Sequence, residues 1–226
     1  MLNLARYFCL TALLLLICSA CRSVPPSPAA ARPDAYEQWV TNNARYPRTL
    51  DMYRDEELMK QAKPTSPIFI CLSQQRGRLY VNGKVAADWP VSSGTDEHPT
   101  PTGTFQVLEK KSDHISRTWG KILDSSGRCV IADADARTDT IPEGGQFIGS
   151  IMPYWQRLTP CGIGMHTGKV RAGRQLSHGC VRTPSLMAKE LFRITAPGQS
   201  AVTISEEKEP CYPTFSQPLT TSTSAP

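Results

Sequence analysis

The spacing of hydrophobic and polar positions divides the chain into a helical stretch and a longer series of short strands. Over residues 34–64, apolar residues recur three and four positions apart in two segments that Pro47 separates. Asp34, followed three residues later by a glutamate, predicts the start of the first helix, and Thr49, Asp51 or their neighbours are N-cap candidates for the second. We therefore expect residues 34–64 to form a helical N-terminal segment.

The region after Pro67 has the pattern of β-strands. Short apolar or alternating runs are separated by turn residues, and the Asn-Gly pair at 82–83 predicts a hairpin. The stretch PSLMAKELF has helical apolar spacing and predicts a helix over 184–192. We expect strands over 68–72, 78–81, 84–91, 103–110, 128–132, 162–166 and 201–204. Such a chain predicts a mainly β fold, a sandwich or small barrel with a few short helices.

The first twenty residues have the composition of an export signal. A short segment with one arginine and no acid precedes the apolar run CLTALLLLI, which is too short to span a bilayer comfortably. The residues before Cys21 resemble a bacterial lipobox, although Cys18 stands where leucine is commoner. We expect a signal peptide over 1–20 and lipidation of Cys21; a secreted protein cut at the same bond is the alternative.

Two further segments have the composition of unfolded chain. The Pro/Ala-rich stretch over 21–33 predicts a semi-rigid spacer behind the lipidated cysteine, and the Ser/Thr-rich stretch over 206–226 predicts a disordered tail. In lipoproteins of double-membraned bacteria, a residue other than aspartate after the lipidated cysteine favours the outer membrane, and here that residue is Arg22. We therefore expect an exported lipoprotein on the periplasmic side of the outer membrane.

The net charge of +5 at pH 7 is a mild basic excess. The chain has no arginine-rich run and no basic residues interleaved with aromatic ones, so we do not expect nucleic acid as a partner. For an exported protein the available polyanions are lipid headgroups and cell-wall polymers.

The number of cysteines leaves one thiol unpaired outside the export segment. Of eight cysteines, Cys9, Cys18 and Cys21 lie in that segment, and an odd number in an oxidising compartment cannot all form disulfides. We expect Cys180 to be the unpaired one. The sequence does not choose a disulfide pattern among the other four, which are Cys71, Cys129, Cys161 and Cys211.

The stretch SHGCVR, at 177–182, contains the parts of a thiol active site. A cysteine acts as a nucleophile only as the thiolate, so Cys180 needs a base, and His166 and His178 are candidates. Gly179 lets the backbone bend and approach a substrate, so that neighbouring N–H groups can point at an oxyanion. Arg182 shares a face with the thiol if the segment is extended, and its guanidinium suits a substrate carboxylate.

Two other interpretations of these residues remain open at this stage. Cys180 can be a buried small hydrophobic residue, as free cysteines often are. His166, His178 and Cys180 also have the chemistry of zinc ligands, but no CxxC or HExxH motif accompanies them.

Three segments together resemble the L,D-transpeptidase (YkuD-type) catalytic domain. GIGMHTGKVRAGRQLSHGCVR resembles the signature of that family, a histidine followed by a loop and then by Ser/Thr-His-Gly-Cys. SPIFICLSQQRGRLYVNGKVAADWPVSSG resembles its opening strands, and HPTPTGTFQV resembles its Thr-Pro-x-Gly-x-Phe segment. The segments occur in the order of the family, so we assign residues 66–205 to a catalytic domain of this type, with the corresponding β-sandwich or barrel.

The resemblance implies a role for three residues of the reaction centre. Cys180 matches the nucleophile, His166 the general base, and Thr167 supplies the backbone carbonyl that orients the imidazole. The family often has glycine or serine at the position of Thr167, but a backbone group does this work. An imidazolium beside the thiol favours the thiolate, so we expect the Cys180 pKa to lie below its ordinary value.

The other matched residues surround the thiol. By the resemblance, His178 and Gly179 shape the oxyanion site. Ser177 and Arg182 match the flanking polar residues of the motif, and we expect them to bind substrate.

The resemblance implies an L,D-transpeptidase, a cysteine acyltransferase that acts on peptidoglycan stem peptides. The thiolate attacks the carbonyl of the third stem residue, a diamino acid, and the terminal D-alanine leaves as a thioester forms. Transfer to an amine of a second stem gives a 3→3 cross-link, transfer to a lysine of a wall-anchored protein attaches that protein, and transfer to water makes the enzyme an L,D-carboxypeptidase. We expect transpeptidation, without a cofactor; a zinc protein and a non-catalytic wall-binding lipoprotein are the alternatives from other classes.

Overall fold

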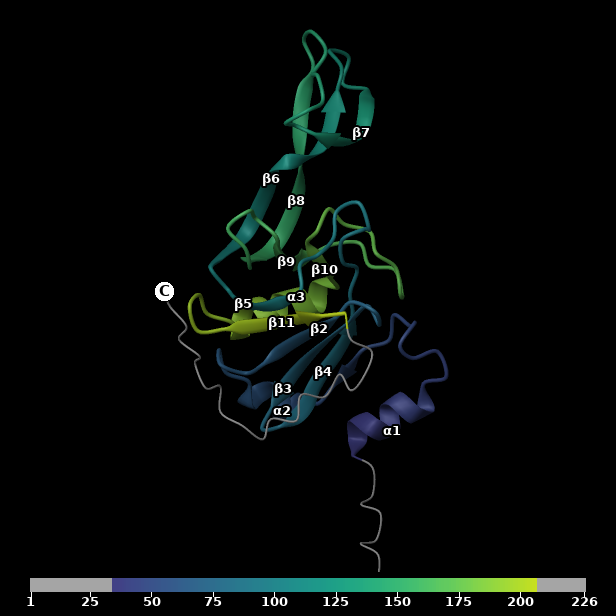
Figure 1. The fold of residues 1–226 in the computed structure, drawn as a ribbon, viewed down its shortest axis with the longest axis vertical. Helices are drawn as coiled ribbons and strands as arrows, with labels where there is room; N and C mark the ends of the chain where they lie inside the picture. Colours follow the sequence, from purple (N-terminus) through teal and green to yellow (C-terminus); the bar gives the residue numbers. More distant parts are fainter. Residues whose placement is uncertain (1–33, 207–226) are drawn as a thin grey trace, which may run out of the picture. The chain divides into compact units, whose positions relative to one another are not determined.

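The computed structural model describes residues 34–206, which form two β-sheets and three helices (Figure 1). Within these residues, the first sheet has the strand order β1 (Tyr53–Arg54), β4 (Lys84–Pro90), β3 (Arg76–Val81), β2 (Ile68–Cys71), β11 (Ala201–Ser205), β5 (Gly103–Gln106). The second has the order β10 (Val181–Thr183), β9 (Gly164–Thr167), β8 (Gln146–Arg157), β6 (Glu109–Leu123), β7 (Cys129–Asp135). The helices are α1 (Ala35–Asn42), α2 (Glu56–Gln61) and α3 (Ser185–Ile194). The expected mainly β fold with a few short helices is confirmed.

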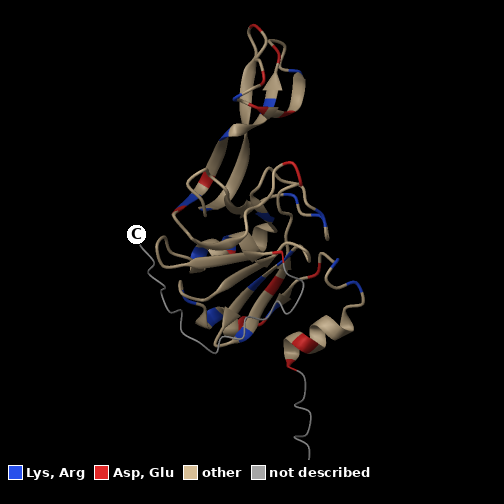
Figure 2. Ribbon diagram, viewed as in Figure 1, with Lys and Arg blue, Asp and Glu red and all other residues tan. Residues whose placement is uncertain are grey.

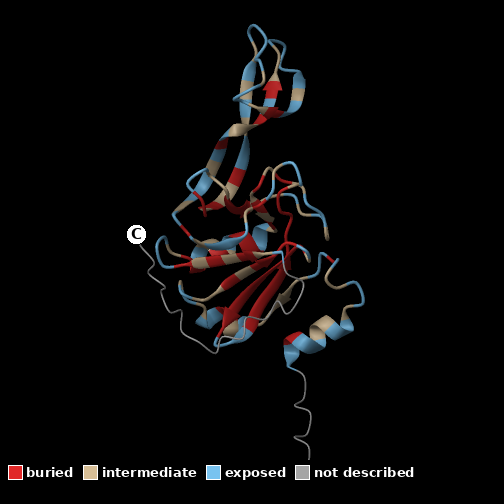
Figure 3. Ribbon diagram, viewed as in Figure 1, coloured by how far each residue is buried: buried red, intermediate tan, exposed pale blue. Residues whose placement is uncertain are grey.

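The hydrophobic core joins both sheets. β2, β3, β4 and β11 contribute apolar residues that are almost fully buried, among them Ile70, Leu79, Trp89 and Ile204, and Figure 3 shows buried positions running along these strands. The second sheet adds Met165 and Val181 to the same cluster, and α3 adds Met187 and Leu191. The strands β9 and β10 are therefore packed directly on the core, which fixes the position of the residues at their ends.

Most expected elements are present, with ends that differ by at most three residues from those expected. The expected helix start near Thr49 or Asp51 is wrong. Tyr53 and Arg54 pair with β4 as an edge strand, and the helix begins after Asp55. The Asp55 carboxylate accepts hydrogen bonds from two backbone N–H groups of the first turn, at 3.0 Å each, and so caps the helix.

The single strand expected over 103–110 is also wrong. It is interrupted at residues 107–108, where the Val107 backbone turns to pair with Gly198 and Ser200, so that β5 and β6 belong to different sheets. The long strands β6 and β8 are not predicted by the sequence pattern beyond the first two residues of β6. Most side chains of β6 are polar, and the apolar residues of β8 do not alternate regularly with polar ones.

A buried cluster of charges attaches the N-terminal segment to the first sheet. Asp88, on β4, lies fully buried between Arg76 and Arg78 of β3, at 2.5 and 3.0 Å, and Figure 2 shows these charges on the hairpin. The hydroxyl groups of Tyr36 and Tyr46 donate to the same carboxylate at 2.6 and 3.0 Å. Burial raises the pKa of Tyr36, which keeps its hydroxyl protonated as a donor.

Arg76 extends this cluster to the chain before α2. Its guanidinium donates to the carbonyl oxygens of Thr49 and Asp51 at 3.0 and 2.9 Å. The segment over 34–64 is thus held to the sheet by hydrogen bonds to buried charges as well as by apolar contacts. No helix among residues 34–206 has the length and hydrophobicity needed to cross a membrane.

We predict that Asp88→Asn lowers the free energy of unfolding by about 3–5 kcal/mol, because it leaves two buried guanidinium groups without their counter-charge. Chemical denaturation measures this loss. Glu57→Gln is the matched control, since Glu57 pairs with Lys60 on the exposed surface of α2 and its loss should change the midpoint little. Equal effects of the two substitutions would contradict the importance of the buried cluster.

Candidate active site

The parallel pairing of β9 and β10 brings His166 and Cys180 into one site. Arg182 lies opposite His166 in the ladder, and Val181 lies opposite Met165. Cys180 immediately precedes β10, so its side chain points to the same face as that of Arg182, two residues on. Two residues that are fourteen positions apart in sequence thereby face a common cleft.

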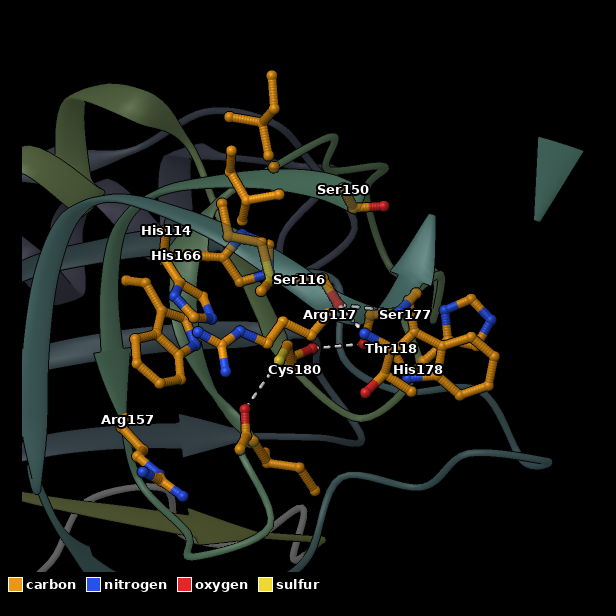
Figure 4. A pocket seen from close by; sticks show the side chains of 18 of the residues that line it. His114, Ser116, Arg117, Thr118, Ser150, Arg157, His166, Ser177, His178 and Cys180 are labelled. Atoms are coloured by element: carbon orange, nitrogen blue, oxygen red, sulfur yellow. Dashed lines mark hydrogen bonds between the residues drawn. The ribbon is translucent and has the colours of Figure 1, made fainter. Parts of the chain in front are cut away.

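The cleft has a volume of about 1060 Å³, and all the residues of the expected centre line it. Its walls come from β6, β8, β9, the turn before β9 and the loop over 177–182. In Figure 4, His114 and His166 lie on one side of Cys180, and Thr118 and His178 lie on the other. The size is ample for a peptide segment.

His166 is 6% exposed and held in one tautomer. Its Nδ1 lies 2.8 Å from the carbonyl oxygen of Thr167, so Nδ1–H donates and Nε2 keeps its lone pair. The hydrogen bond expected from Thr167 is therefore present. Burial lowers the pKa of His166 to about 4, which leaves the imidazole neutral at neutral pH.

The expectation of a lowered thiol pKa at Cys180 is wrong for this structure. Burial raises the pKa of Cys180, and the opposing contributions of the Gly164 N–H and of Arg182 are smaller. With His166 neutral as well, no imidazolium is present to stabilise a thiolate. The resting pair is a thiol beside a neutral base.

The backbone of residues 91–95, which follows β4, holds the cysteine loop in place. The N–H and C=O groups of Ser92 pair with those of Arg182 at 3.0 and 2.9 Å. The Ser93 carbonyl accepts from Leu176 and Ser177, and the Thr95 N–H donates to the Ser177 carbonyl. These bonds tie the cysteine loop and the start of β10 to the segment that leaves the first sheet.

Gly94 and Thr100 complete this support at the point of closest approach. A Cβ on Gly94 would lie 2.8 Å from the Gly179 Cα and 2.0 Å from the His98 carbonyl oxygen, so only glycine fits. The Thr100 hydroxyl accepts from the Gly94 N–H at 2.8 Å and donates to the Gly179 carbonyl at 2.7 Å. The two upstream segments of the sequence signature therefore have a structural function at the loop.

Ser177 and Gly179 stabilise the conformation of the cysteine loop. Ser177 is buried, its hydroxyl donates to the Cys180 carbonyl, and it accepts from the Gly179 N–H at 3.2 Å. Gly179 has a φ of +105°, which strongly favours glycine. These bonds set the conformation of the backbone that carries Cys180. Arg182 is half-buried and lines the cleft.

His178 packs against the long strand β6 and contacts β7. Its ring stacks on Trp119 with centroids 3.8 Å apart and lies 4.8 Å from the ring of His98. Its Nε2 is 3.3 Å from a carboxylate oxygen of Asp133 on β7. Burial lowers the pKa of His178, and Asp133 opposes that shift. His178 therefore connects the cysteine loop to β6 and β7.

An irregularity in β6 creates this contact. The pairing with β8 passes from Ile115 opposite Ile151 to Gly120 opposite Gly149, so four residues on β6 oppose one on β8. The extra residues, 116–119, bulge toward the cleft and carry Trp119 to His178. Nothing in the local sequence pattern predicted this bulge.

Sequence reasoning also missed the far wall of the cleft. His114 stacks on Trp155 with centroids 3.9 Å apart, and both line the cleft beside His166. Cys161 lies there too, on the turn before β9. The histidines could have indicated this wall: the chain has only four, and all four lie in or beside the cleft.

Among residues 34–206, Cys129, Cys161 and Cys180 have free thiols, and Cys211 lies outside the described residues. The same part of the chain has no group of three or more His, Cys, Asp or Glu residues placed to hold a metal ion.

Comparisons with known proteins agree with the sequence signature. Residues 67–204 match the profile of a family described as the L,D-transpeptidase catalytic domain (YkuD). No curated protein matches the chain.

Similar solved structures include three L,D-transpeptidases. One from Mycobacterium smegmatis is 20% identical, with a TM-score of 0.47 over 62% of this chain and 58% of that chain. One from Stackebrandtia nassauensis is 20% identical, with a TM-score of 0.45 over 64% of this chain and 57% of that chain. The catalytic domain of an L,D-transpeptidase from E. faecium is 26% identical, with a TM-score of 0.44 over 63% of this chain and 98% of that chain. The chain thus spans little more than half the length of the first two.

The opposite pKa shifts of two thiols in the cleft yield a prediction. The Thr159 hydroxyl beside Cys161 lowers the pKa of that exposed thiol, whereas burial raises the pKa of Cys180. Iodoacetamide alkylation, followed by peptide mass analysis across pH, should label Cys161 faster than Cys180 at neutral pH. The Cys180 rate should keep rising above the ordinary thiol pKa. A Cys180 rate that levels off below neutral pH would contradict the neutral resting pair.

Proposed function

The chain belongs to the family of L,D-transpeptidase catalytic domains, and from this we propose that it is a cysteine acyltransferase acting on peptidoglycan stem peptides. The observation that carries the proposal is the pairing of β9 with β10. It sets Cys180 and a neutral, oriented His166 in one peptide-sized cleft. A nucleophile, a base and a group that orients the base are the parts that acyl transfer requires.

We propose that Cys180 begins the reaction as a thiol. His166 takes the proton through Nε2 while sulfur attacks the carbonyl of the third stem residue, a diamino acid. The C–N bond to the terminal D-alanine then breaks, the imidazolium returns its proton to the leaving amine, and a thioester remains. The Thr167 carbonyl stabilises the transient charge on His166 through the Nδ1–H bond.

The second half of the reaction reverses these proton transfers. His166 deprotonates the acceptor, which attacks the thioester and releases Cys180. An amine of a second stem as acceptor gives a 3→3 cross-link, a lysine of a wall-anchored protein gives attachment, and water gives hydrolysis. We propose an amine as the acceptor and transpeptidation as the outcome.

The cationic side chains of the cleft fit a substrate that carries carboxylates. Arg117, Lys169 and Arg182 line it, and within residues 34–206 none of the three forms an ion pair. We propose that Arg182 binds a stem carboxylate near the thiol. Ser177 and Gly179 support the reaction by shaping the loop, and His178 supports it by fixing the loop to Trp119.

We predict that Cys180→Ala abolishes turnover of isolated cell-wall fragments while the protein stays folded by circular dichroism. His166→Ala should lower the rate by about 10²–10⁴-fold, the usual contribution of a general base. Mass analysis of the fragments measures both effects and identifies the acceptor. Cys129→Ala, which removes an exposed thiol outside the cleft, is the control and should keep full activity. Turnover by Cys180→Ala would overturn the proposal.

We propose that the protein reaches the wall as a lipoprotein, with a signal peptide over 1–20, lipid on Cys21, and the spacer over 21–33. These segments lie outside the described residues, and the proposal rests on their sequence. An anchor on the periplasmic side of the outer membrane would place the catalytic domain beside its substrate.

We predict that Cys21→Ser releases the protein from the membrane fraction, because a single signal peptide without lipid leaves no anchor. Immunoblots of soluble and membrane fractions measure this. Cys18→Ser is the matched control and should remain with the membrane. A Cys21→Ser protein that still sediments with membranes would refute the lipid anchor.

A further inference from the structure

A second thiol, Cys161, stands on the turn that leads into β9. The turn is tight, because the Gly162 N–H donates to the Thr159 carbonyl at 3.1 Å and the Ile163 carbonyl accepts from Leu158 and Thr159. Cys161 is exposed at the tip of this turn and lines the same cleft as Cys180. None of the roles assigned above involves it.

The turn lies directly against the nucleophile proposed above. The Cys180 Sγ is 3.9 Å from the carbonyl oxygen of Gly162, the residue that follows Cys161, and Figure 4 marks this contact. On the next residues of the turn, the Gly164 N–H also faces the Cys180 sulfur. The backbone that carries one thiol is therefore in contact with the sulfur of the other.

The surroundings of the two thiols differ in a way that separates their reactivity. Cys161 is open to solvent, and its Sγ lies 3.1 Å from the Thr159 hydroxyl, which together with the nearby Arg157 favours the thiolate. Cys180 is half-buried and protonated at rest. Oxidants attack exposed thiolates first, so Cys161 is the thiol that an oxidant in the cleft meets.

We propose that Cys161 and Cys180 form a reversible disulfide when the protein meets a peroxide, with Cys161 as the oxidised thiol and Cys180 as the resolving one. Formation of this disulfide would stop acyl transfer only if Cys180 is the nucleophile, as the proposed function assigns. Formation of the disulfide itself does not depend on that assignment.

The chemistry balances in two steps. The Cys161 thiolate attacks a peroxide oxygen, the O–O bond breaks, a sulfenic acid forms, and hydroxide leaves and is protonated to water. Cys180 then gives its proton to His166 and attacks the sulfenic sulfur. The S–O bond breaks, and the leaving hydroxide takes the proton back from His166 and departs as a second water. Two thiols lose two electrons in total, and the peroxide gains them.

Closing the bond requires the turn to move, because a disulfide holds its sulfurs at about 2.05 Å. Gly162 provides the freedom for this movement. Its φ is +94°, and a Cβ built on it would have no atom within 4 Å, so the tip of the turn has open space around it. The bridge would occupy the sulfur that attacks the substrate, and would protect that sulfur from irreversible oxidation until a thiol reductant removes the bridge.

Tryptic mapping of the full chain after treatment with hydrogen peroxide tests the proposal. Cleavage isolates Cys161 in LTPCGIGMHTGK, Cys180 in QLSHGCVR and Cys129 in CVIADADAR. We expect a species with the summed mass of the first two peptides less two hydrogens. Iodoacetamide labelling of Cys180 should be lost as this species forms and should return after dithiothreitol.

Two variants and one control variant make the test specific. Cys161→Ser should abolish the linked species, and its Cys180 should then accumulate sulfinic acid that dithiothreitol does not reverse. Cys180→Ser should leave a Cys161 sulfenic acid that dimedone traps. Cys129→Ser should keep the Cys161–Cys180 species, since that thiol lies outside the cleft.

Oxidation of Cys161 to sulfinic acid without any linked species would overturn the proposal, as would a bridge from Cys180 to another cysteine. These outcomes are read from masses alone. They are therefore separate from a failure of wall-fragment turnover, which would refute the proposed function and leave the disulfide standing.

Discussion

The site depends on one short parallel pairing, that of β10 with β9. β10 has only three residues, and three residues cannot hold a register by themselves. The register is held because the other edge of the same loop pairs with Ser92 and Ser93 at the end of β4, and because Val181 and Met165 are buried in the core. The cysteine is therefore fixed between two sheets, and a loss of core packing would displace the nucleophile as well as weaken the fold.

His166 and Cys180 are neutral in the absence of substrate because they are buried between the two sheets. The same burial that fixes His166 and Cys180 disfavours the charged form of each, because the loss of solvation outweighs the favourable contributions of the neighbouring groups, such as that of Arg182 to Cys180. In the proposed mechanism, charge develops only when substrate arrives and the proton moves to His166. The buried Asp88 cluster shows the opposite solution, in which two guanidinium groups and two tyrosine hydroxyls neutralise and satisfy one carboxylate. The buried groups of the candidate site are thus kept neutral, whereas the buried Asp88 carboxylate is kept charged and paired.

The fold class could be predicted from the sequence, and so could the residues that the fold brings together in the cleft around Cys180, whereas the walls of the cleft could not. Cys180, His166 and Thr167 were identified because their motif is local and their chemistry is specific. The pKa of Cys180 was mistaken because it depends on burial, which the motif does not contain. The stack of His178 on Trp119 could not be predicted, because it depends on a bulge about sixty residues away in the sequence, and only the folded chain brings the two together. The strands β6 and β8 could not be predicted because neither has a regular alternation of apolar and polar residues.

The contact between Gly94 and Gly179 has a consequence for how such a chain can change over evolutionary time. One glycine has no space for a side chain and the other has a φ of +105°, so each position excludes other residues for its own steric reason. A substitution at either one would also move the backbone that the other touches, because the Thr100 hydroxyl joins the two. Two glycines that are far apart in the sequence are therefore constrained together, because a substitution at either position would disturb the backbone at both.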